Sequence, residues 1–221
     1  MTTYLITGPS RGIGREMVTQ LLARGDIVIA ACRSPAPHLA TLGAKVIDGI
    51  EVTDPKAVQR LAESLSGQKI DVLVNNAGIT NNSPWETEPF DIMRAQFEVN
   101  ALAPIEVTRR LLPALAANAK IVMISSRLGS IANTTAAIPD LGYRMSKAAL
   151  NIAGKLIAES LKPQGVTVMM IHPGYVKTEM NFGDGDIDAT TSAKGVIALI
   201  DRVGPDQTGT YWHVNGEPLP W

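Results

Sequence analysis

The chain has 221 residues, of which 45% are hydrophobic and 19% charged. This composition excludes a wholly disordered chain, and the length suffices for one α/β domain with a sizeable core. Twenty basic residues against 21 acidic ones leave a net charge of −1, so nucleic acid is not an expected partner.

No targeting or membrane segment is visible in the sequence. The longest early apolar run, Ile27–Cys32, is far shorter than the roughly 20 residues of a membrane span. The first eight residues already form the pattern of a strand and a glycine turn, which leaves no space for a signal peptide. Cys32 is the single cysteine, which permits no internal disulfide and fits a reducing compartment. We therefore expect a soluble cytoplasmic protein.

Short apolar runs alternate with longer helical patterns along the whole chain. The runs are rich in valine and isoleucine, as is typical of strands buried on both faces of a parallel sheet. The predicted strands are Tyr4–Thr7, Ile27–Cys32, Lys45–Asp48, Val72–Asn75, Lys120–Ser125, Val166–Ile171 and Thr210–Val214. The predicted helices are Ile13–Arg24, Pro55–Ser66, Pro89–Ala117, Tyr143–Leu161 and Ser192–Arg202. This alternation predicts a single α/β domain over residues 1–221, a doubly wound parallel sheet with helices on both faces.

Two stretches, Ser126–Gly142 and Thr178–Thr191, lack periodicity and are rich in turn-forming residues. Both follow predicted strands. Loops after the carboxyl ends of strands build the binding site of an open α/β sheet, so both are candidate pocket walls.

A glycine-rich turn joins the first strand to the first helix. It carries Gly8, Gly12 and Gly14, a spacing that differs from the common G-x-G-x-x-G fingerprint. Glycine tolerates positive φ and lets the backbone approach a pyrophosphate, and the next helix presents its free N–H groups to the phosphates. A turn needed only for close strand–helix packing would carry the same glycines, so the motif alone leaves both interpretations open.

Other motifs follow the glycine turn in a fixed order. Asn75-Asn76-Ala77-Gly78 follows the fourth strand, and Tyr143-x-x-x-Lys147 opens a long helix. Asn100, Ser126 and Pro173-Gly174 lie between and after them. The set resembles the short-chain dehydrogenase/reductase family over essentially the whole chain. Ser125–Ile131, Gly142–Asn151 and the ending Asn215–Trp221 are similar to its C-factor-like carbonyl reductases.

The resemblance implies a Rossmann-type reductase with Asn100, Ser126, Tyr143 and Lys147 as catalytic residues. From the motifs and the resemblance together we predict a cofactor site. Its residues are Gly8, Ser10, Arg11, Gly12, Ile13, Gly14, Arg33, Asn76, Ala77, Gly78, Tyr143, Lys147, Pro173, Gly174, Val176 and Thr178.

Tyr143 and Lys147 are four residues apart on a predicted helix and therefore share a face. A free tyrosine has a pKa near 10, and an adjacent ammonium favours the phenolate by up to roughly 4 kcal/mol. We expect this pair to bring the pKa of Tyr143 near neutrality, so that it acts as a general acid or base. A tyrosine and a lysine on a solvated helix face would have the same spacing.

Ser126 and Asn100 complete the expected catalytic set. A hydroxyl at Ser126 can hydrogen-bond a substrate carbonyl oxygen as charge develops there, although a serine at a strand end can also satisfy backbone groups. The resemblance implies that Asn100 kinks its helix, holds a water and links Lys147 to a proton relay. A solvent-facing asparagine is the alternative, with Pro104 as the cause of the kink.

The end of the second strand bears on the choice of cofactor. An acidic residue there binds the ribose 2′-hydroxyl of NAD, whereas an arginine accommodates the 2′-phosphate of NADP. This strand ends without an acid, and Arg33 follows it. We therefore predict NADP(H), with Arg33 and Arg11 at the 2′-phosphate. Glu51 stands where the family usually has aspartate, so the resemblance leaves its adenine contact open.

The expected reaction is hydride transfer between NADPH and a carbonyl or alcohol. Two alternatives remain: an NADP-sensing protein without turnover, and an enzyme that works mainly as an alcohol dehydrogenase. His38, His172 and His213 lack metal-ligand spacing, so we predict no metal site.

Apolar residues in or beside the predicted loops suggest an apolar or aromatic substrate: Trp85, Ile138, Leu141, Tyr175, Met180 and Phe182. Residues Met145–Leu161 carry apolar side chains on more than one face, which predicts a helix that buries more than one face. The resemblance implies that subunits pair through this helix and the one before it. We expect a homodimer or larger homo-oligomer.

Overall fold

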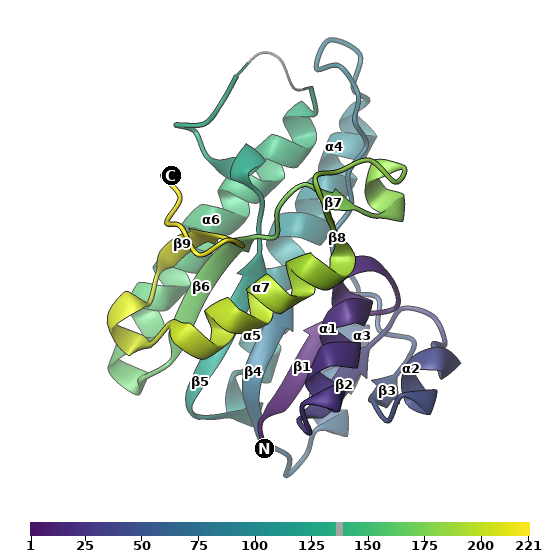
Figure 1. Ribbon diagram of the computed structural model, residues 1–221, viewed down its shortest axis with the longest axis vertical. Coiled ribbons are helices and arrows are strands. Elements are labelled where there is room, and N and C mark those ends of the chain that lie inside the picture. The colour runs from purple at the N-terminus through teal and green to yellow at the C-terminus, as the bar shows by residue number, and fades with distance from the viewer. Residues whose placement is uncertain (136–138) are drawn as a thin grey trace.

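A seven-stranded parallel sheet organises the chain, in the order β3-β2-β1-β4-β5-β6-β9 (Figure 1). The computed structural model describes residues 1–135 and 139–221. The sheet strands are β1 (Thr3–Thr7), β2 (Ile27–Ala31), β3 (Lys45–Ile47), β4 (Ile70–Asn75), β5 (Leu115–Ile124), β6 (Thr167–His172) and β9 (Thr210–His213). The short strands β7 (Val176–Lys177) and β8 (Ile187–Asp188) pair apart from it.

Helices cover both faces of the sheet. They are α1 (Gly12–Ala23), α2 (Pro37–Thr41), α3 (Pro55–Ser64), α4 (Phe90–Phe97), α5 (Ala103–Leu111), α6 (Leu141–Leu161) and α7 (Ala189–Arg202). Helices α1 and α7 lie on the face toward the viewer in Figure 1, with α3, α5 and α6 behind. Strand side chains alternate between the two faces, so Ile6 packs with Met17 of α1 whereas Leu5 packs with Leu61 and Val107 behind.

The structure confirms the predicted doubly wound sheet and each of the seven predicted strands, with shifted ends. The predicted helix Pro89–Ala117 is wrong as one element: α4, a π-helical turn (Glu98–Leu102) and α5 follow one another, and β5 already begins at Leu115. Pro104 contributes to this break, because it has no N–H to donate to the carbonyl of Asn100. Helix α2 was not predicted, since five residues show no periodicity.

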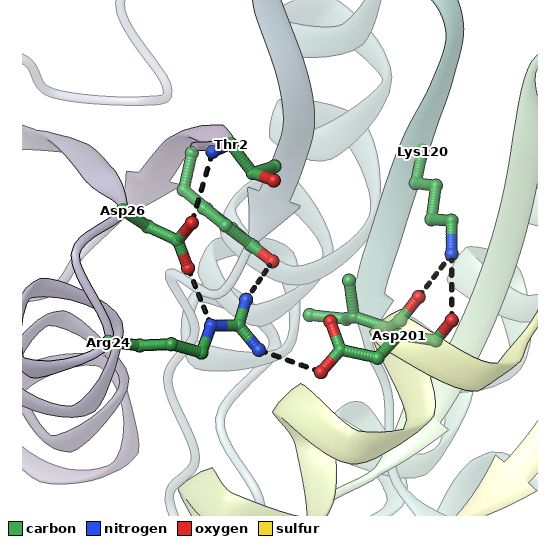
Figure 2. A network of polar contacts seen from close by, with 7 residues as sticks. Thr2, Arg24, Asp26, Lys120 and Asp201 are labelled. Atoms are coloured by element: carbon green, nitrogen blue, oxygen red, sulfur yellow. Dashed lines mark hydrogen bonds and ion pairs between the residues drawn. The ribbon is translucent and has the colours of Figure 1, made fainter.

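Polar side chains tie the helix ends together at the amino ends of the strands. Arg24 donates to Asp26 at 2.6 Å, to Asp201 at 2.7 Å and to the Tyr4 hydroxyl at 2.7 Å (Figure 2). Lys120 donates to the carbonyls of Ile200 and Asp201. The guanidinium therefore joins the end of α1 to β1 and α7, at the opposite end of the sheet from the loops that follow the strands.

The strand order reverses between β1 and β4, because β2 and β3 extend one way from β1 and β5 and β6 the other. In such a sheet the loops after the two central strands diverge and leave a crevice at the carboxyl ends. The fold therefore puts the glycine turn after β1 beside residues 75–78 after β4. In the described parts of the chain, no helix is long and apolar enough to cross a bilayer.

Candidate functional site

A cavity of about 340 Å³ lies at the carboxyl ends of the strands. Its lining residues are Ile13, Thr80, Asn82, Ser125, Ser126, Arg127, Leu128, Asp140, Tyr143, His172, Pro173, Gly174, Tyr175, Val176, Thr178, Met180 and Asn181. Both predicted pocket walls contribute to it, the loop after β5 through Ser126 and Asp140 and the loop after β6 through Thr178 and Met180.

The first helix begins at this cavity without a side-chain cap. Arg11 at the N-cap of α1 makes no capping hydrogen bond, and no acidic residue stands in the first turn. By contrast, α3, α6 and α7 each start at an aspartate whose carboxylate accepts a backbone N–H. The unsatisfied N–H groups and the positive dipole end of α1 suit a phosphate, so this end of the cavity fits a dinucleotide pyrophosphate.

The glycines of the turn serve both packing and access. Gly8 and Gly12 have φ of 63° and 55°, in the left-handed region that favours glycine. A Cβ on Gly14 would lie 2.6 Å from the Asn76 amide nitrogen, whereas one on Gly12 would reach only the Thr178 methyl, at 3.5 Å. Gly14 is thus required for packing, while Gly12 keeps open the space between the turn and the loop after β6.

Asn76 braces this turn. Its side-chain amide donates to the carbonyls of Thr7 and Gly8, both at 3.0 Å, and the Thr7 hydroxyl accepts from the N–H groups of Asn76 and Ala77. The preceding residue, Asn75, donates from its side-chain amide to the Thr108 hydroxyl at 3.2 Å. The side chain of Asn76 therefore shapes the predicted cofactor site by holding the backbone of the turn.

Tyr143 and Ser126 come together on the cavity wall, from the first turn of α6 and the end of β5. Both residues line the cavity, and the Ser126 hydroxyl oxygen accepts the N–H of Leu128 at 3.2 Å. Burial raises the pKa of Tyr143 to about 12, the nearby Ser126 hydroxyl opposes this shift, and the charge of Asp140 adds to it. The expected pKa near neutrality is therefore wrong in this structure, because burial dominates, and Tyr143 is a neutral phenol at physiological pH.

Lys147 is buried one turn further along α6. Its ammonium donates to the Ile124 carbonyl at 2.8 Å and lies 5.7 Å from the centroid of the Tyr143 ring. Burial lowers the pKa of Lys147 to about 8. The alternative of a lysine on a solvated face is excluded, because Lys147 is only 4% exposed.

Asn100 lies in the π-helical turn and is fully buried. Its side-chain oxygen accepts from the N–H of Ile79 at 2.9 Å. Its side-chain amide nitrogen donates to the carbonyl of Ile79 at 2.9 Å and to the Ser146 hydroxyl at 3.0 Å. A Cβ on Gly78 would lie 3.2 Å from the Asn100 oxygen and 3.7 Å from the Lys147 nitrogen. Asn100 therefore does not face solvent, and it ties the loop after β4 to α6 beside Lys147.

The two arginines predicted to face a 2′-phosphate are both exposed. Arg11 forms an ion pair with Glu179 at 2.6 Å, and Arg33 forms one with Glu51 at 3.7 Å. Glu51 also accepts from the Thr53 N–H and hydroxyl. Exposed ion pairs of this kind contribute at most about 1 kcal/mol, so neither arginine is held firmly away from a competing anion.

Sequence reasoning missed several residues of the cavity. Asp140 caps α6, accepting from the N–H of Tyr143 and from the side chains of Thr80 and Gln96. An aspartate three residues before Tyr143 is a sequence signal for a helix N-cap at this position. His172 directly precedes Pro173-Gly174, and its ring lies edge-on to that of His213, with centroids 5.0 Å apart. No local spacing reveals that contact.

Only some of the residues predicted to contact the substrate line the cavity. Tyr175 and Met180 line the cavity. Trp85, Leu141 and Phe182 lie outside its lining, and Phe182 is 90% exposed. Ile138 falls outside the described residues.

Comparison with known proteins agrees with this fold and site. The short chain dehydrogenase family model matches residues 2–186. The chain therefore belongs to the short-chain dehydrogenase family, a class of oxidoreductases.

Individual relatives match two thirds or more of the chain. It is 34% identical to a 1-hydroxy-2-glutathionyl-2-methyl-3-butene dehydrogenase of a Rhodococcus species, over 100% of both chains. It is 37% identical to the C-signal protein of Myxococcus xanthus, over 69% of this chain and 93% of that one. Among solved structures, the NADPH-bound carbonyl reductase from chicken fatty liver superposes with a TM-score of 0.92 at 30% identity, covering 100% of this chain and 99% of the other.

The lowered pKa of Lys147 makes stability depend on pH in a specific direction. The folded pKa of about 8 lies below the value of 10.5 for a free lysine, so the folded state binds fewer protons between these values and gains stability as pH rises through that window. We expect the free energy of unfolding of the wild type, relative to Lys147→Met, to rise by about 2 kcal/mol from about pH 7.5 to about pH 10 in urea titrations. The matched control is Lys155→Met, which removes a lysine of the same helix that pairs with Glu159 at the surface and so tests the substitution itself without burial of the ammonium. A flat difference for Lys147→Met would contradict the shift.

Proposed function

We propose that this protein is an NADPH-dependent carbonyl reductase, with residues 1–221 acting as one domain. One observation carries the proposal: the Ser126 hydroxyl and the neutral Tyr143 phenol both line the wall of one cavity, next to a buried lysine. A neutral phenol is the state that can donate a proton to a carbonyl oxygen during reduction. The NADPH-bound chicken carbonyl reductase, similar over the whole chain, supports the same reading.

Four residues of the chain have distinct roles in the proposed reaction. Ser126 accepts the Leu128 N–H, so its own hydroxyl hydrogen remains to donate to a substrate carbonyl oxygen. Tyr143 gives its proton to that oxygen, and the ammonium of Lys147, 5.7 Å from the centroid of the ring, stabilises the phenolate that is left. Asn100 holds the loop after β4 and Ser146 in place around Lys147.

The cofactor site is assigned to the residues around the first helix. The uncapped N-terminus of α1 would hold the pyrophosphate, and Pro173, Gly174, Val176 and Thr178 would line the nicotinamide end. NADPH bound there supplies the hydride that reduces the carbonyl carbon. Arg11 and Arg33 favour NADPH over NADH, because a hydrogen bond to a charged phosphate contributes about 1.5–3 kcal/mol, more than their exposed ion pairs.

A protein that senses NADP without turnover would use the same fold. The Ser126–Tyr143 pair beside a buried lysine favours the enzyme, since a sensor needs neither a proton donor nor a buried cation at this point. Loss of NADPH absorbance with a panel of aldehydes, ketones and quinones separates the two. The reverse rate with alcohols and NADP⁺ tests the alternative that the enzyme works mainly as an alcohol dehydrogenase.

We also propose that two or more copies associate through α6. This helix buries Leu150 and Ala158 against the sheet, while Met145, Ile152 and Leu156 are 50%, 69% and 66% exposed along a second stripe. Exposed apolar stripes of this kind mark association surfaces. The cytoplasm is the proposed location, since the single cysteine, Cys32, is buried and unpaired.

Replacing the proton donor tests the reaction. Tyr143→Phe removes the hydroxyl but keeps the ring in place, so we expect near-normal NADPH binding in a fluorescence titration. The steady-state kcat with a carbonyl substrate should fall by about 10²–10⁴, the contribution of general acid catalysis. Retention of the wild-type kcat would refute Tyr143 as the acid.

Association through α6 predicts that a charge on its exposed stripe separates the subunits. At micromolar concentration, light scattering should give at least twice the 23.5 kDa chain mass for the wild type and the single-chain mass for Ile152→Glu. Leu42→Glu is the matched control, because Leu42 is also exposed but lies after α2. A wild type that scatters only as a single chain overturns this assembly.

Cofactor choice is tested at the end of β2. Arg33→Ala should weaken NADPH binding by about tenfold to hundredfold and hardly change NADH binding, which lacks the phosphate. The measurement is kcat/KM for both cofactors in the wild type, in Arg33→Ala and in the control Arg109→Ala, which changes an exposed arginine on α5. An equal effect on both cofactors, or a wild-type preference for NADH, would show that Arg33 does not read the 2′-phosphate.

A further inference from the structure

Ser126 is the N-cap residue of a short 3-10 turn, Arg127–Gly129. Its hydroxyl accepts the N–H of Leu128 at 3.2 Å, and its carbonyl accepts the N–H of Gly129 at 2.8 Å. Both hydrogen bonds lie within the turn, so they fix its shape but not its position relative to Tyr143 on α6. Contacts from outside the turn therefore set the distance between the two reactive hydroxyls.

Tyr211 of β9 supplies such a contact. Its hydroxyl donates a hydrogen bond to the backbone carbonyl of Ser126, 85 positions away in the chain. Tyr211 is 2% exposed, and burial raises its pKa, so the hydroxyl keeps the proton that it donates. Strand β9 is itself anchored to β6, where Tyr211 pairs with Met170. The phenol thus ties the backbone of Ser126 to the edge strand of the central sheet.

The segment that follows β9 covers the Tyr211 ring and reaches the loop after β5 (Figure 1). The Trp221 ring stacks on the Tyr211 ring, with centroids 5.3 Å apart and 22° between the planes. The Trp221 carbonyl accepts the N–H of Ala132 at 2.9 Å, and the Pro220 carbonyl accepts from the Ser130 hydroxyl at 2.7 Å. This segment therefore holds both the tyrosine ring and the chain that leaves the turn.

The opposite side of the turn is tied to α6 by a buried amide. The Asn151 side chain donates to the carbonyl of Gly129 at 3.2 Å and accepts from the Ser125 hydroxyl at 2.6 Å. A Cβ on Gly129 would lie 2.7 Å from the backbone carbonyl carbon of Lys147, so the turn packs directly on the backbone of α6. The turn is thus held between α6 and β9, and Tyr211 contacts Ser126 itself.

We propose that Tyr211 is a positioning residue for the reduction, and that Trp221 acts through it by stacking. The inference rests on the proposed reductase function. Tyr211 is not among the residues that line the cavity, so it acts by fixing where the Ser126 hydroxyl meets the substrate oxygen. Misplacing a reacting group by about 1 Å can cost about a hundredfold in rate, so this one buried hydroxyl affects turnover strongly.

The first test removes one buried hydroxyl at a time. Tyr211→Phe keeps the ring that stacks on Trp221 but loses the donor. We expect kcat with a carbonyl substrate to fall about tenfold, while the Kd for NADPH in a fluorescence titration stays unchanged. The matched control is Tyr4→Phe, which removes a buried hydroxyl that Arg24 bonds at the opposite end of the sheet. Both variants should lose roughly 2–4 °C in Tm, but only Tyr211→Phe should lose turnover.

A double-mutant cycle with Ser126→Ala separates positioning from a general loss of structure. Ser126→Ala removes the hydroxyl that Tyr211 positions, so it should lower kcat by about 10²–10³. Tyr211→Phe should then have almost no further effect on kcat in that background. A structural role for Tyr211 would lower kcat by the same factor in both backgrounds. Such additive losses, or a wild-type kcat in Tyr211→Phe, overturn the proposal.

Two substitutions of Trp221 test the stacking. Trp221→Leu removes the aromatic ring and should lower kcat by about twofold to tenfold, again without changing the Kd for NADPH. Trp221→Phe keeps a ring over Tyr211 and should restore most of the wild-type kcat. Equal kcat values for the two variants would show that stacking on Tyr211 has no part in catalysis.

Hydrogen exchange tests the hold of Tyr211 on the turn without turnover. Because Leu128 and Gly129 donate their N–H groups to Ser126, a peptide covering residues 127–132 should exchange faster in Tyr211→Phe and at the wild-type rate in Tyr4→Phe. If this peptide responds but no carbonyl compound is reduced, the hold on the turn stands and the reductase proposal fails. If carbonyl compounds are reduced, the kinetic cycle decides, and its failure leaves the reductase proposal standing. Unchanged exchange together with no turnover overturns both.

Discussion

The burial of one ammonium group is the constraint around which the candidate site is built. Moving Lys147 out of water lowers its pKa from 10.5 to about 8, which corresponds to a cost of about 3 kcal/mol for the charged form. The Ile124 carbonyl takes one of its three N–H donors. Three elements surround this cation and must therefore keep their relative positions: the end of β5, the first turns of α6 and the π-helical turn at Asn100. Ser126 and Tyr143 lie on two of those elements, so the position of the reactive pair follows from where the lysine is buried.

Local pattern was enough to predict the architecture. The runs rich in valine and isoleucine correctly predicted the sheet strands, because this composition is typical of strands in a sheet that helices cover on both faces. The break at Asn100 was not predictable as a π-helical turn, since its cause includes the side chain's two contacts with Ile79, which is distant in sequence. The early start of β5 depends likewise on pairing between Leu115 and Ile70, a contact that periodicity within one segment does not encode.

The site was predictable as a set of motifs but not as an electrostatic environment. The spacing of Tyr143 and Lys147 correctly places them on one helix face, yet it suggested a lowered tyrosine pKa because it carries no information about burial. The ion pair between Arg11 and Glu179 joins residues far apart in the chain, and sequence alone gives no measure of such a contact. His172 shows the same limit, because a histidine before Pro-Gly looks like part of a turn until the cavity beside it is seen.

Burial acts on Tyr143, Lys147 and His172 in one consistent way. It favours the uncharged form of each, raising the pKa of Tyr143 and lowering the pKa values of Lys147 and His172. The shift for His172 is large enough to keep the ring neutral, whereas Lys147, with a pKa of about 8, remains mostly protonated at neutral pH. The cations near Ser126 are therefore Lys147, buried beneath the tyrosine, and Arg127, at the exposed rim. In the proposed reaction the negative charge left on Tyr143 would face the buried cation, whereas Arg127 stands at the surface.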